Sequence, residues 1–199
     1  MNKLVSIAKQ KIGTREGTGA HIALVNEYNS IRPLPHGYKL KTSDSWCAAF
    51  VSVCAKEAGL VDFPFECSVR RMYNKAKDAK RTSKTPKVGS LVVYDWGPNG
   101  TLDHVGIIES IDGDTLTVIE GNFANAVGRR KISKKAAVIY AYITTNAEDI
   151  PEDLTRVALA VIRGDYGTGN TRRVKLAAAG YDYKAVQAEV NRIYKSRRR

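Results

Sequence analysis

The sequence lacks a long hydrophobic run. No stretch approaches the roughly 18 consecutive apolar residues that a membrane-spanning helix needs. Residues 1–11 also lack the continuous apolar segment of a secretory signal peptide. We therefore expect a protein that is made in the cytoplasm, has no export signal of its own and forms no stable association with a membrane.

Cysteine and histidine are scarce, with three of each among 199 residues. An odd number of cysteines argues against a framework of disulfide bonds. No pair of these residues has the spacing of zinc ligands, and no twelve-residue stretch has the aspartates and asparagines of a calcium loop. We therefore expect neither a bound metal nor another cofactor.

Acidic residues are too few to balance the basic ones. The net charge is +12, from 32 Lys and Arg against 20 Asp and Glu. Half of this excess lies in residues 151–199, which have 11 basic and 5 acidic side chains, so this part is about three times as basic per residue as the rest. Such a charge favours a polyanionic partner: a nucleic acid, an anionic membrane or an anionic cell wall.

Residues 1–145 are expected to form one α+β domain. Apolar residues at helical spacing, or polar starts and glycine ends, predict helices over residues 2–12, 20–28, about 46–58 and 68–79. Segments rich in β-branched residues predict strands over residues 90–94, 104–111, 115–120 and 137–144. Helices followed by a meander of strands indicate N-terminal helices packed on an antiparallel sheet.

The rest of the chain is expected to form a separate small module. Residues 146–151 form a short polar linker, and residues 152–199 contain three short helical segments ended by a basic tail. Asn170 and Asp182 are plausible caps for the second and third helices. A bundle of this size has little core, so its stability should be modest.

One helix start has the character of a reactive site. Ser43, Asp44 and Ser45, any of which could cap a helix, precede an apolar run that begins at Trp46 and Cys47. Cys47 falls in the first turn, where the helix dipole lowers the pKa of a thiol. The alternative is a buried thiol that serves only as core, which is the expectation for Cys54 and Cys67.

A base for this thiol is found in the strands. His104 begins one predicted strand and Glu120 and Asn122 end the next, so a hairpin at residues 112–114 brings them to the same end of the sheet. A nucleophilic thiol needs an adjacent imidazole and a group that orients it, and either Glu120 or Asn122 could be that group. The alternatives are a polar residue at a strand edge and an ordinary turn. His21 and His36 are expected at the surface.

Four segments in this order resemble the CHAP family of cysteine, histidine-dependent amidohydrolases/peptidases, which have a papain-like fold related to NlpC-type peptidases. The segments are Ser45–Val51, Val88–Tyr94, Asp103–Ile108 and Glu120–Asn122. The resemblance implies Cys47 as nucleophile, His104 as general base, Glu120 as the residue that orients it and Asn122 as a fourth polar member. Some relatives bind calcium near the N-terminus, but residues 13–17 lack the aspartates for it.

The C-terminal module resembles one copy of the CW seven cell-wall-binding repeat. The resemblance lies in Leu154–Ile162, Gly164–Gly167, Arg172–Arg173 and Leu176–Asn191. It implies a three-helix bundle that binds the muropeptide of peptidoglycan. Glycines permit close approach, and Arg and Tyr suit carboxylates and sugars, so the candidate binding residues are Asp165, Gly167, Arg172, Gly180 and Tyr181.

Together the two resemblances imply a peptidoglycan hydrolase of the phage endolysin type, which accumulates in the host cytoplasm and acts on the cell wall after release. The first expectation is an N-acetylmuramoyl-L-alanine amidase, and the alternative is an endopeptidase that cuts the stem peptide or cross-bridge. A cellular autolysin would be favoured by a signal peptide. A non-catalytic protein that binds nucleic acid would need clustered basic residues interleaved with aromatic ones, whereas the basic residues here are scattered.

Overall fold

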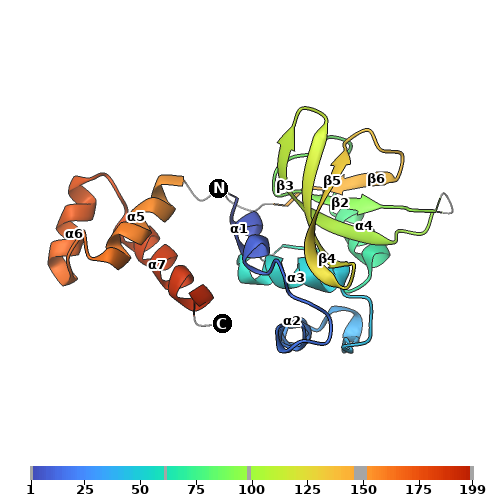
Figure 1. The fold of residues 1–199 in the computed structure, drawn as a ribbon, viewed down its shortest axis with the longest axis horizontal. Coiled ribbons are helices and arrows are strands. Elements are labelled where there is room, and N and C mark those ends of the chain that lie inside the picture. The colour runs from blue at the N-terminus through green and yellow to red at the C-terminus, as the bar shows by residue number, and fades with distance from the viewer. Residues whose placement is uncertain (1, 61, 98–99, 146–151, 198–199) are drawn as a thin grey trace. The chain divides into compact units, whose positions relative to one another are not determined.

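The computed structural model describes residues 2–60, 62–97, 100–145 and 152–197 (Figure 1). The chain divides into two compact units, Asn2–Glu148 and Asp149–Arg199. The linker expected over residues 146–151 lies outside the described residues. Among those that are described, no helix has both the length and the apolar character to cross a bilayer.

The first half of the larger unit is helical. Its elements are α1 (Lys3–Gln10), α2 (Gly19–Asn29), the 3₁₀ turn η1 (Pro35–Gly37), α3 (Cys47–Glu57) and α4 (Val69–Asp78). Polar side chains before three of these helices accept hydrogen bonds from first-turn amides, as N-caps do: Asn2 for α1, Thr18 for α2 and Ser68 for α4. Helix α3 is buried along nearly its whole length, as its apolar sequence predicts.

The second half is a six-stranded antiparallel sheet with the order β1-β6-β2-β3-β4-β5. The strands are β1 (Thr82–Ser83), β2 (Leu91–Tyr94), β3 (His104–Asp112), β4 (Thr115–Phe123), β5 (Ala126–Ser133) and β6 (Ile139–Ile143). The two edge strands, β1 and β5, are absent from the strands expected above. Edge strands are commonly short or charged, and β5 contains Arg129, Arg130 and Lys131, so neither shows the apolar signature of an inner strand.

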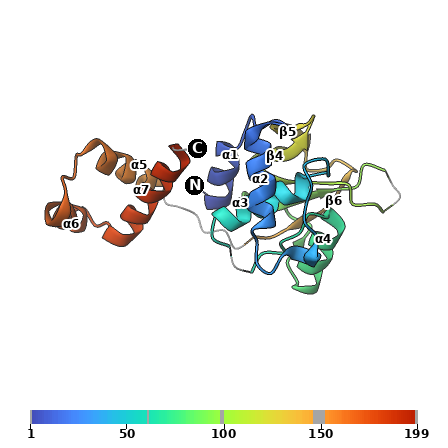
Figure 2. The same cartoon turned by 90° about the horizontal axis from the view of Figure 1, so that it is seen from below.

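The sheet has buried side chains on both faces. Alternate residues of β2 point in opposite directions: Leu91 and Val93 belong to the core shared with the helices, whereas Val92 and Tyr94 belong to a second cluster. Helix α3 packs on β3 and β4, and α2 packs on α3, so α2 and α3 lie on the same side of the sheet (Figure 2). This architecture confirms the α+β class predicted from the sequence.

Two glycines of the sheet allow close packing near the site, one between β4 and α3 and one between β3 and β4. A Cβ at Gly121 of β4 would lie 2.5 Å from the Cβ of Phe50 in α3. A Cβ at Gly106 of β3 would lie 2.7 Å from the Cγ of Glu120 on the paired strand. Both distances are shorter than atoms tolerate, so a larger residue at either position would displace the helix or the carboxylate.

The smaller unit is a bundle of α5 (Glu152–Arg163), α6 (Gly169–Ala178) and α7 (Tyr183–Arg197), as expected. Among the described residues of this unit, seven buried ones form a core cluster: Val157, Ala158, Val161, Leu176, Val186, Val190 and Ile193. Helix α6 begins after Thr168 rather than after Asn170. Asp182 accepts a hydrogen bond from the amide of Ala185 (2.7 Å), as a helix cap does.

Truncating Leu176 should unfold this small unit. Leu176 is the one buried residue of α6 and is fully inaccessible to solvent. Leu176→Ala should lower the free energy of unfolding by about 2–5 kcal/mol, which is most of what so small a core supplies. Thermal unfolding of the full chain, followed by circular dichroism, should show early loss of helix. The control is Val174→Ala on the same helix, where the side chain is 61% exposed; equal effects would contradict the packing described.

Candidate active site

The start of α3 has no side-chain cap. Its N-cap residue is Trp46, and among the described residues no side chain forms a cap hydrogen bond with the first-turn amides of the helix. The prediction that Ser43, Asp44 or Ser45 caps this helix is therefore wrong. Asp44 instead accepts hydrogen bonds from the Lys41 amide and the Tyr38 hydroxyl. The amides at the positive end of α3 are consequently available to an anion.

Trp46 is fully buried and holds the start of α3 in place through its contacts. Its indole Nε1 donates a hydrogen bond to Glu16 Oε2 (3.1 Å), and its ring lies 4.9 Å from that of His21. His21 is buried, so the expectation that it lies at the surface is wrong. Its Nδ1 accepts a hydrogen bond from the Gly17 amide, and burial lowers the pKa of His21, with the charge of Glu16 opposing this. The polar residues around His21 led to the expectation of an exposed side chain. They could not show that Trp46, which is distant in sequence, packs against it.

The structure brings Cys47, His104 and Glu120 together. Cys47 is the first residue of α3, His104 is the first of β3, and Glu120 lies on β4 beside Gly106. His104 Nε2 donates a hydrogen bond to Glu120 Oε2 (3.1 Å), and the Cys47 thiol hydrogen-bonds to the same imidazole. Because Glu120 occupies Nε2, the nitrogen left for the thiol is Nδ1.

Burial and hydrogen bonding act against each other on His104. Burial, the strongest influence, lowers the pKa of His104, but hydrogen bonds and charges from Cys47 and Glu120 together outweigh it and raise the pKa to about 9. For Glu120, burial raises the pKa, and hydrogen bonds from His104 and Arg130 outweigh this, so that its pKa lies below the usual value. At neutral pH the pair therefore consists of an imidazolium and a carboxylate.

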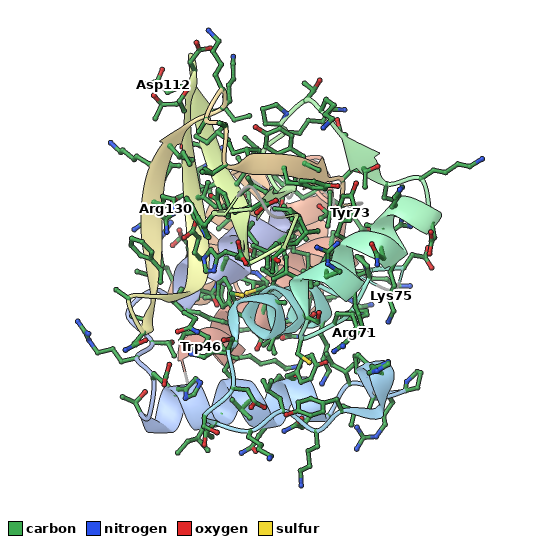
Figure 3. The ribbon with its side chains drawn as sticks, turned by 90° about the vertical axis from the view of Figure 1, so that its right-hand side faces the viewer. Trp46, Arg71, Tyr73, Lys75, Asp112 and Arg130 are labelled. Carbon is green, nitrogen blue, oxygen red and sulfur yellow. The ribbon has the colours of Figure 1, made fainter. Side chains whose placement is uncertain are left out.

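Arg130 completes the surroundings of Glu120 and was not among the predicted site residues. Its Nε donates to both Glu120 oxygens, at 2.9 and 3.0 Å, and Glu120 is fully buried. Arg130 comes from β5 (Figure 3), the strand that the sequence did not reveal. Val118 pairs with Arg130 and Glu120 with Gly128, so Glu120 and Arg130 are diagonal neighbours on one face. Only the register of β4 and β5 could have identified this residue.

An aromatic group borders the imidazole. The ring of Tyr94 stacks on that of Trp96, with 4.8 Å between centroids, and on that of His104, with 5.9 Å between centroids. The guanidinium of Arg130 lies 4.8 Å from the Trp96 ring and 4.5 Å from the Phe123 ring. Burial, with the neighbouring charge of Glu120, raises the pKa of Tyr94, so its hydroxyl stays neutral. Trp96 remains 41% exposed and therefore presents an aromatic face to solvent beside the site.

Asn122 lies two residues beyond Glu120, where the pairing of β4 with β5 is irregular. Its φ of +56° lies in the left-handed region, which asparagine tolerates better than most residues. The side chain that binds the imidazole is that of Glu120. Of the two groups left open by the sequence, Glu120 is the one that hydrogen-bonds to His104. The orienting role of Glu120 and a fourth polar role for Asn122 stay predictions.

The other two cysteines have different surroundings. Cys54 is fully buried in α3, and burial raises the pKa of its thiol, so it stays neutral and unreactive. Cys67 is partly exposed, and its sulfur lies 3.9 Å from Arg71 Nη2. Within the described parts of the chain, no three His, Cys, Asp or Glu side chains are placed to hold a metal ion together.

The five candidate binding residues of the small unit do not form one cluster. Asp165, Gly167 and Arg172 lie at the start of α6, where Arg172 Nε donates to the Gly167 carbonyl oxygen (3.0 Å). Gly180 and Tyr181 follow its last turn, about 15 Å away by the rise of a ten-residue helix. Arg172 also reaches Gln187 of α7, and Tyr181 packs on the core. These contacts give both side chains a structural function.

The site combines a thiol at the start of a helix, an adjacent imidazole and a carboxylate that hydrogen-bonds to the imidazole. This arrangement activates thiols as nucleophiles. Two regions of the sequence match family models. Residues 37–122 match the CHAP domain, and residues 155–194 match the CW_7 repeat. Two separate regions of the chain are thus similar to the CHAP domain and the CW_7 repeat, as the sequence resemblances predicted.

Two solved structures are similar to the chain. The crystal structure of Ly7917 matches with 14% sequence identity and a TM-score of 0.46, over 72% of this chain and 61% of the other. The crystal structure of Ly7917 with the hydrolyzing product of MDP matches with 18% identity and a TM-score of 0.36, over 62% and 61%. This chain thus spans about 61% of the length of those chains. No curated protein matches the sequence.

The raised pKa of His104 predicts the alkaline limit of activity. The imidazolium predominates below pH about 9 and loses its proton as the pH rises through that value. A reaction that uses the imidazolium to stabilise a thiolate and to protonate a leaving amine should therefore slow above pH about 9. The measurement is the pH dependence of kcat/KM on soluble muropeptides. An alkaline limb near 6.5, the ordinary value for histidine, would contradict the assigned contacts.

Proposed function

We propose that the chain is a peptidoglycan hydrolase that cleaves an amide bond by acyl transfer through Cys47, most simply as an N-acetylmuramoyl-L-alanine amidase. The observation that supports this best is the contact of one imidazole with both the Cys47 thiol and the buried Glu120 carboxylate. Each group has a chemically distinct function, and each comes from a different element of the fold.

The acylation step follows from the positions of these groups. The Cys47 thiolate, stabilised by the His104 imidazolium, attacks the carbonyl carbon of the substrate and forms a C–S bond. The carbonyl oxygen becomes an oxyanion, which the uncapped amides at the start of α3 stabilise. The C–N bond then breaks as Nδ1 of His104 gives its proton to the leaving amine. The result is a thioester on Cys47 and a neutral imidazole.

Hydrolysis of the thioester restores the enzyme. The neutral His104 takes a proton from water, and the resulting hydroxide attacks the thioester carbonyl. The C–S bond breaks, the substrate leaves as a carboxylic acid, and the thiolate and imidazolium are regenerated. Glu120 holds the ring through Nε2 during both steps, and Arg130 holds Glu120. Both are positioning residues, because neither lies at the reacting atoms.

The C-terminal unit supplies attachment to the same polymer. Residues 151–199 contain 11 basic and 5 acidic side chains, which suits an anionic wall. Tethering a binding module to the catalytic domain raises the local concentration of its substrate without any new contact in the active site. Release of an enzyme with these two parts onto the wall is the expected behaviour of a phage endolysin, and we extend the proposal to that role.

The experiment that tests this function also identifies the bond. Purified Gram-positive cell walls are incubated with the protein, and the soluble fragments are analysed by mass spectrometry. An amidase should release free lactyl carboxylates on muramic acid together with new L-alanine amino termini. New termini elsewhere in the peptide would replace the amidase assignment with an endopeptidase. The absence of any new amine, on several types of wall, would contradict the proposed hydrolysis.

A further inference from the structure

One residue outside the reacting groups links the helix that carries the thiol to the hairpin that carries Glu120. Glu16 lies in the loop between α1 and α2. Its backbone amide donates a hydrogen bond to the carbonyl oxygen of Asn125 (2.8 Å), in the turn between β4 and β5. Its carboxylate oxygen Oε2 accepts one from the indole Nε1 of Trp46 (3.1 Å), the N-cap residue of α3. Glu16 therefore contacts both halves of the site, although it takes no part in the reaction steps above.

The loop that carries Glu16 is held along the edge strand β5. The amide of Val127 donates to the carbonyl oxygen of Thr14 (2.8 Å), and Arg15 forms a β-bridge with Ala126. These bonds join backbone to backbone and do not involve the side chain of Glu16, which is exposed. A substitution of that side chain should therefore leave the path of the loop unchanged and remove only the hydrogen bond to the indole.

Trp46 receives this hydrogen bond directly beside the thiol. It is fully buried, lies between α2 and the sheet (Figure 3) and immediately precedes Cys47 in the chain. Its ring packs against that of His21 in α2, with 4.9 Å between centroids. A buried indole N–H needs an acceptor, and the carboxylate of Glu16 fills that role. A displacement of the indole would carry the first turn of α3 with it.

The rest of α3 is fixed by a different contact. Phe50, one turn beyond the thiol, packs so closely on β4 that a Cβ at Gly121 would lie 2.5 Å from its own Cβ. This packing fixes the distance between helix and sheet. It does not prevent rotation of the first turn about the helix axis, and such a rotation would move Cys47 away from His104. The hydrogen bond between Trp46 and Glu16 is a second anchor that opposes it.

We propose that Glu16 is a positioning residue for the nucleophile, which fixes the first turn of α3 against the β4–β5 hairpin and so keeps the Cys47 thiol on His104. The inference rests on the proposed function, in which these two groups carry out the chemistry. Glu16 acts through Trp46 and touches no reacting atom. Because catalysis depends steeply on the placement of reacting groups, loss of this anchor should lower the reactivity of the thiol.

The test measures the reactivity of each cysteine in the full chain and needs no cell-wall substrate. The protein is treated with iodoacetamide at slightly acidic pH, where only a thiolate stabilised by a neighbouring cation reacts quickly, and alkylation is followed by peptide mass spectrometry. Glu16→Ala should slow alkylation of Cys47 about fivefold or more, because the indole loses its acceptor. The rates at Cys54, which is buried, and at Cys67, which is partly exposed, should not change.

Two further substitutions and a matched control make the result specific. Glu16→Gln should restore the alkylation rate of Cys47, because glutamine keeps an oxygen that can accept from the indole. Trp46→Phe removes the donor of the same hydrogen bond, so adding Glu16→Ala to it should slow Cys47 no further. The control is Glu27→Ala, since Glu27 pairs with Lys56 Nζ (2.8 Å) and links α2 to the other end of α3. It should leave the rate at Cys47 unchanged.

Several results would overturn the inference. Alkylation of Cys47 in Glu16→Ala that is unchanged or faster would do so, as would failure of Glu16→Gln to restore it. Faster labelling of the buried Cys54 in Glu16→Ala would show a loss of folding rather than of position, and would also overturn it. The two Glu16 variants decide the outcome even if Trp46→Phe unfolds the helix. Because alkylation needs no turnover, a failure of wall hydrolysis would contradict the proposed function without changing this result.

Discussion

Cys47→Ala should abolish the release of soluble fragments from purified cell walls. The substitution removes the sulfur that forms the thioester, and no other described group at the site can replace it in the mechanism. We expect the rate to fall by about four orders of magnitude or more, as when other covalent hydrolases lose their nucleophile. The measurement is the initial rate of fragment release at equal concentrations of folded protein. Circular dichroism should be unchanged, because alanine fits the start of α3.

Cys54→Ala is the matched control for this experiment. Cys54 lies two turns further along the same helix and is fully buried. The substitution removes an equivalent thiol from α3 without touching His104 or Glu120. Fragment release should therefore continue at close to the wild-type rate. Full activity of Cys47→Ala would exclude the thiol mechanism, whatever the effect of Cys54→Ala.

Glu120→Gln should have the second largest effect. Glutamine keeps the size of the side chain but loses the charge that stabilises the His104 imidazolium and pairs with Arg130. The pKa of His104 should therefore fall, which moves the alkaline limb of the pH profile below about 9. Poorer alignment of the imidazole should reduce kcat by about 10²- to 10⁴-fold. The measurement is a full pH profile of kcat and KM on soluble muropeptides.

Glu109→Gln provides a comparison for this variant. Glu109 lies on β3 and pairs with Arg129 and Lys9, so it is also a carboxylate of the sheet held by cations. It contacts neither Cys47 nor His104 in the described interactions, and its loss should leave the pH profile in place. A Glu120→Gln enzyme with an unshifted alkaline limb would show that Glu120 does not act on the imidazole.

Sequence reasoning could locate the centre of the site but not its surroundings. His104 and Glu120 were predictable neighbours because a short hairpin connects their strands, and register follows from a tight turn. Arg130 was not, because its charged edge strand lacks an apolar pattern. The buried position of His21 depends on Trp46, which lies 25 residues away in sequence. Such contacts depend on tertiary packing, which local pattern does not encode.

The N-cap of α3 and the candidate binding residues of the small unit also depend on tertiary packing that local sequence does not encode. Ser43, Asp44 and Ser45 have the right chemistry for a cap, but the loop turns Asp44 towards Tyr38 and leaves the helix start open. In the C-terminal unit, the three helical segments could be predicted from the sequence. Which side chains share a face of the bundle depends on how α6 sits on α5 and α7, so the candidate residues were chosen by chemistry and lie at both ends of α6.

The most direct test of the account is a titration of the wild-type enzyme with iodoacetamide near neutral pH. At each step, the residual release of wall fragments is measured and the alkylated cysteines are identified by peptide mass spectrometry. The account predicts that activity falls in proportion to modification of Cys47 and reaches zero when Cys47 is fully alkylated, whatever the labelling of Cys67, with Cys54 unmodified. Activity that persists when Cys47 is fully alkylated, or that falls only with Cys67, would contradict it.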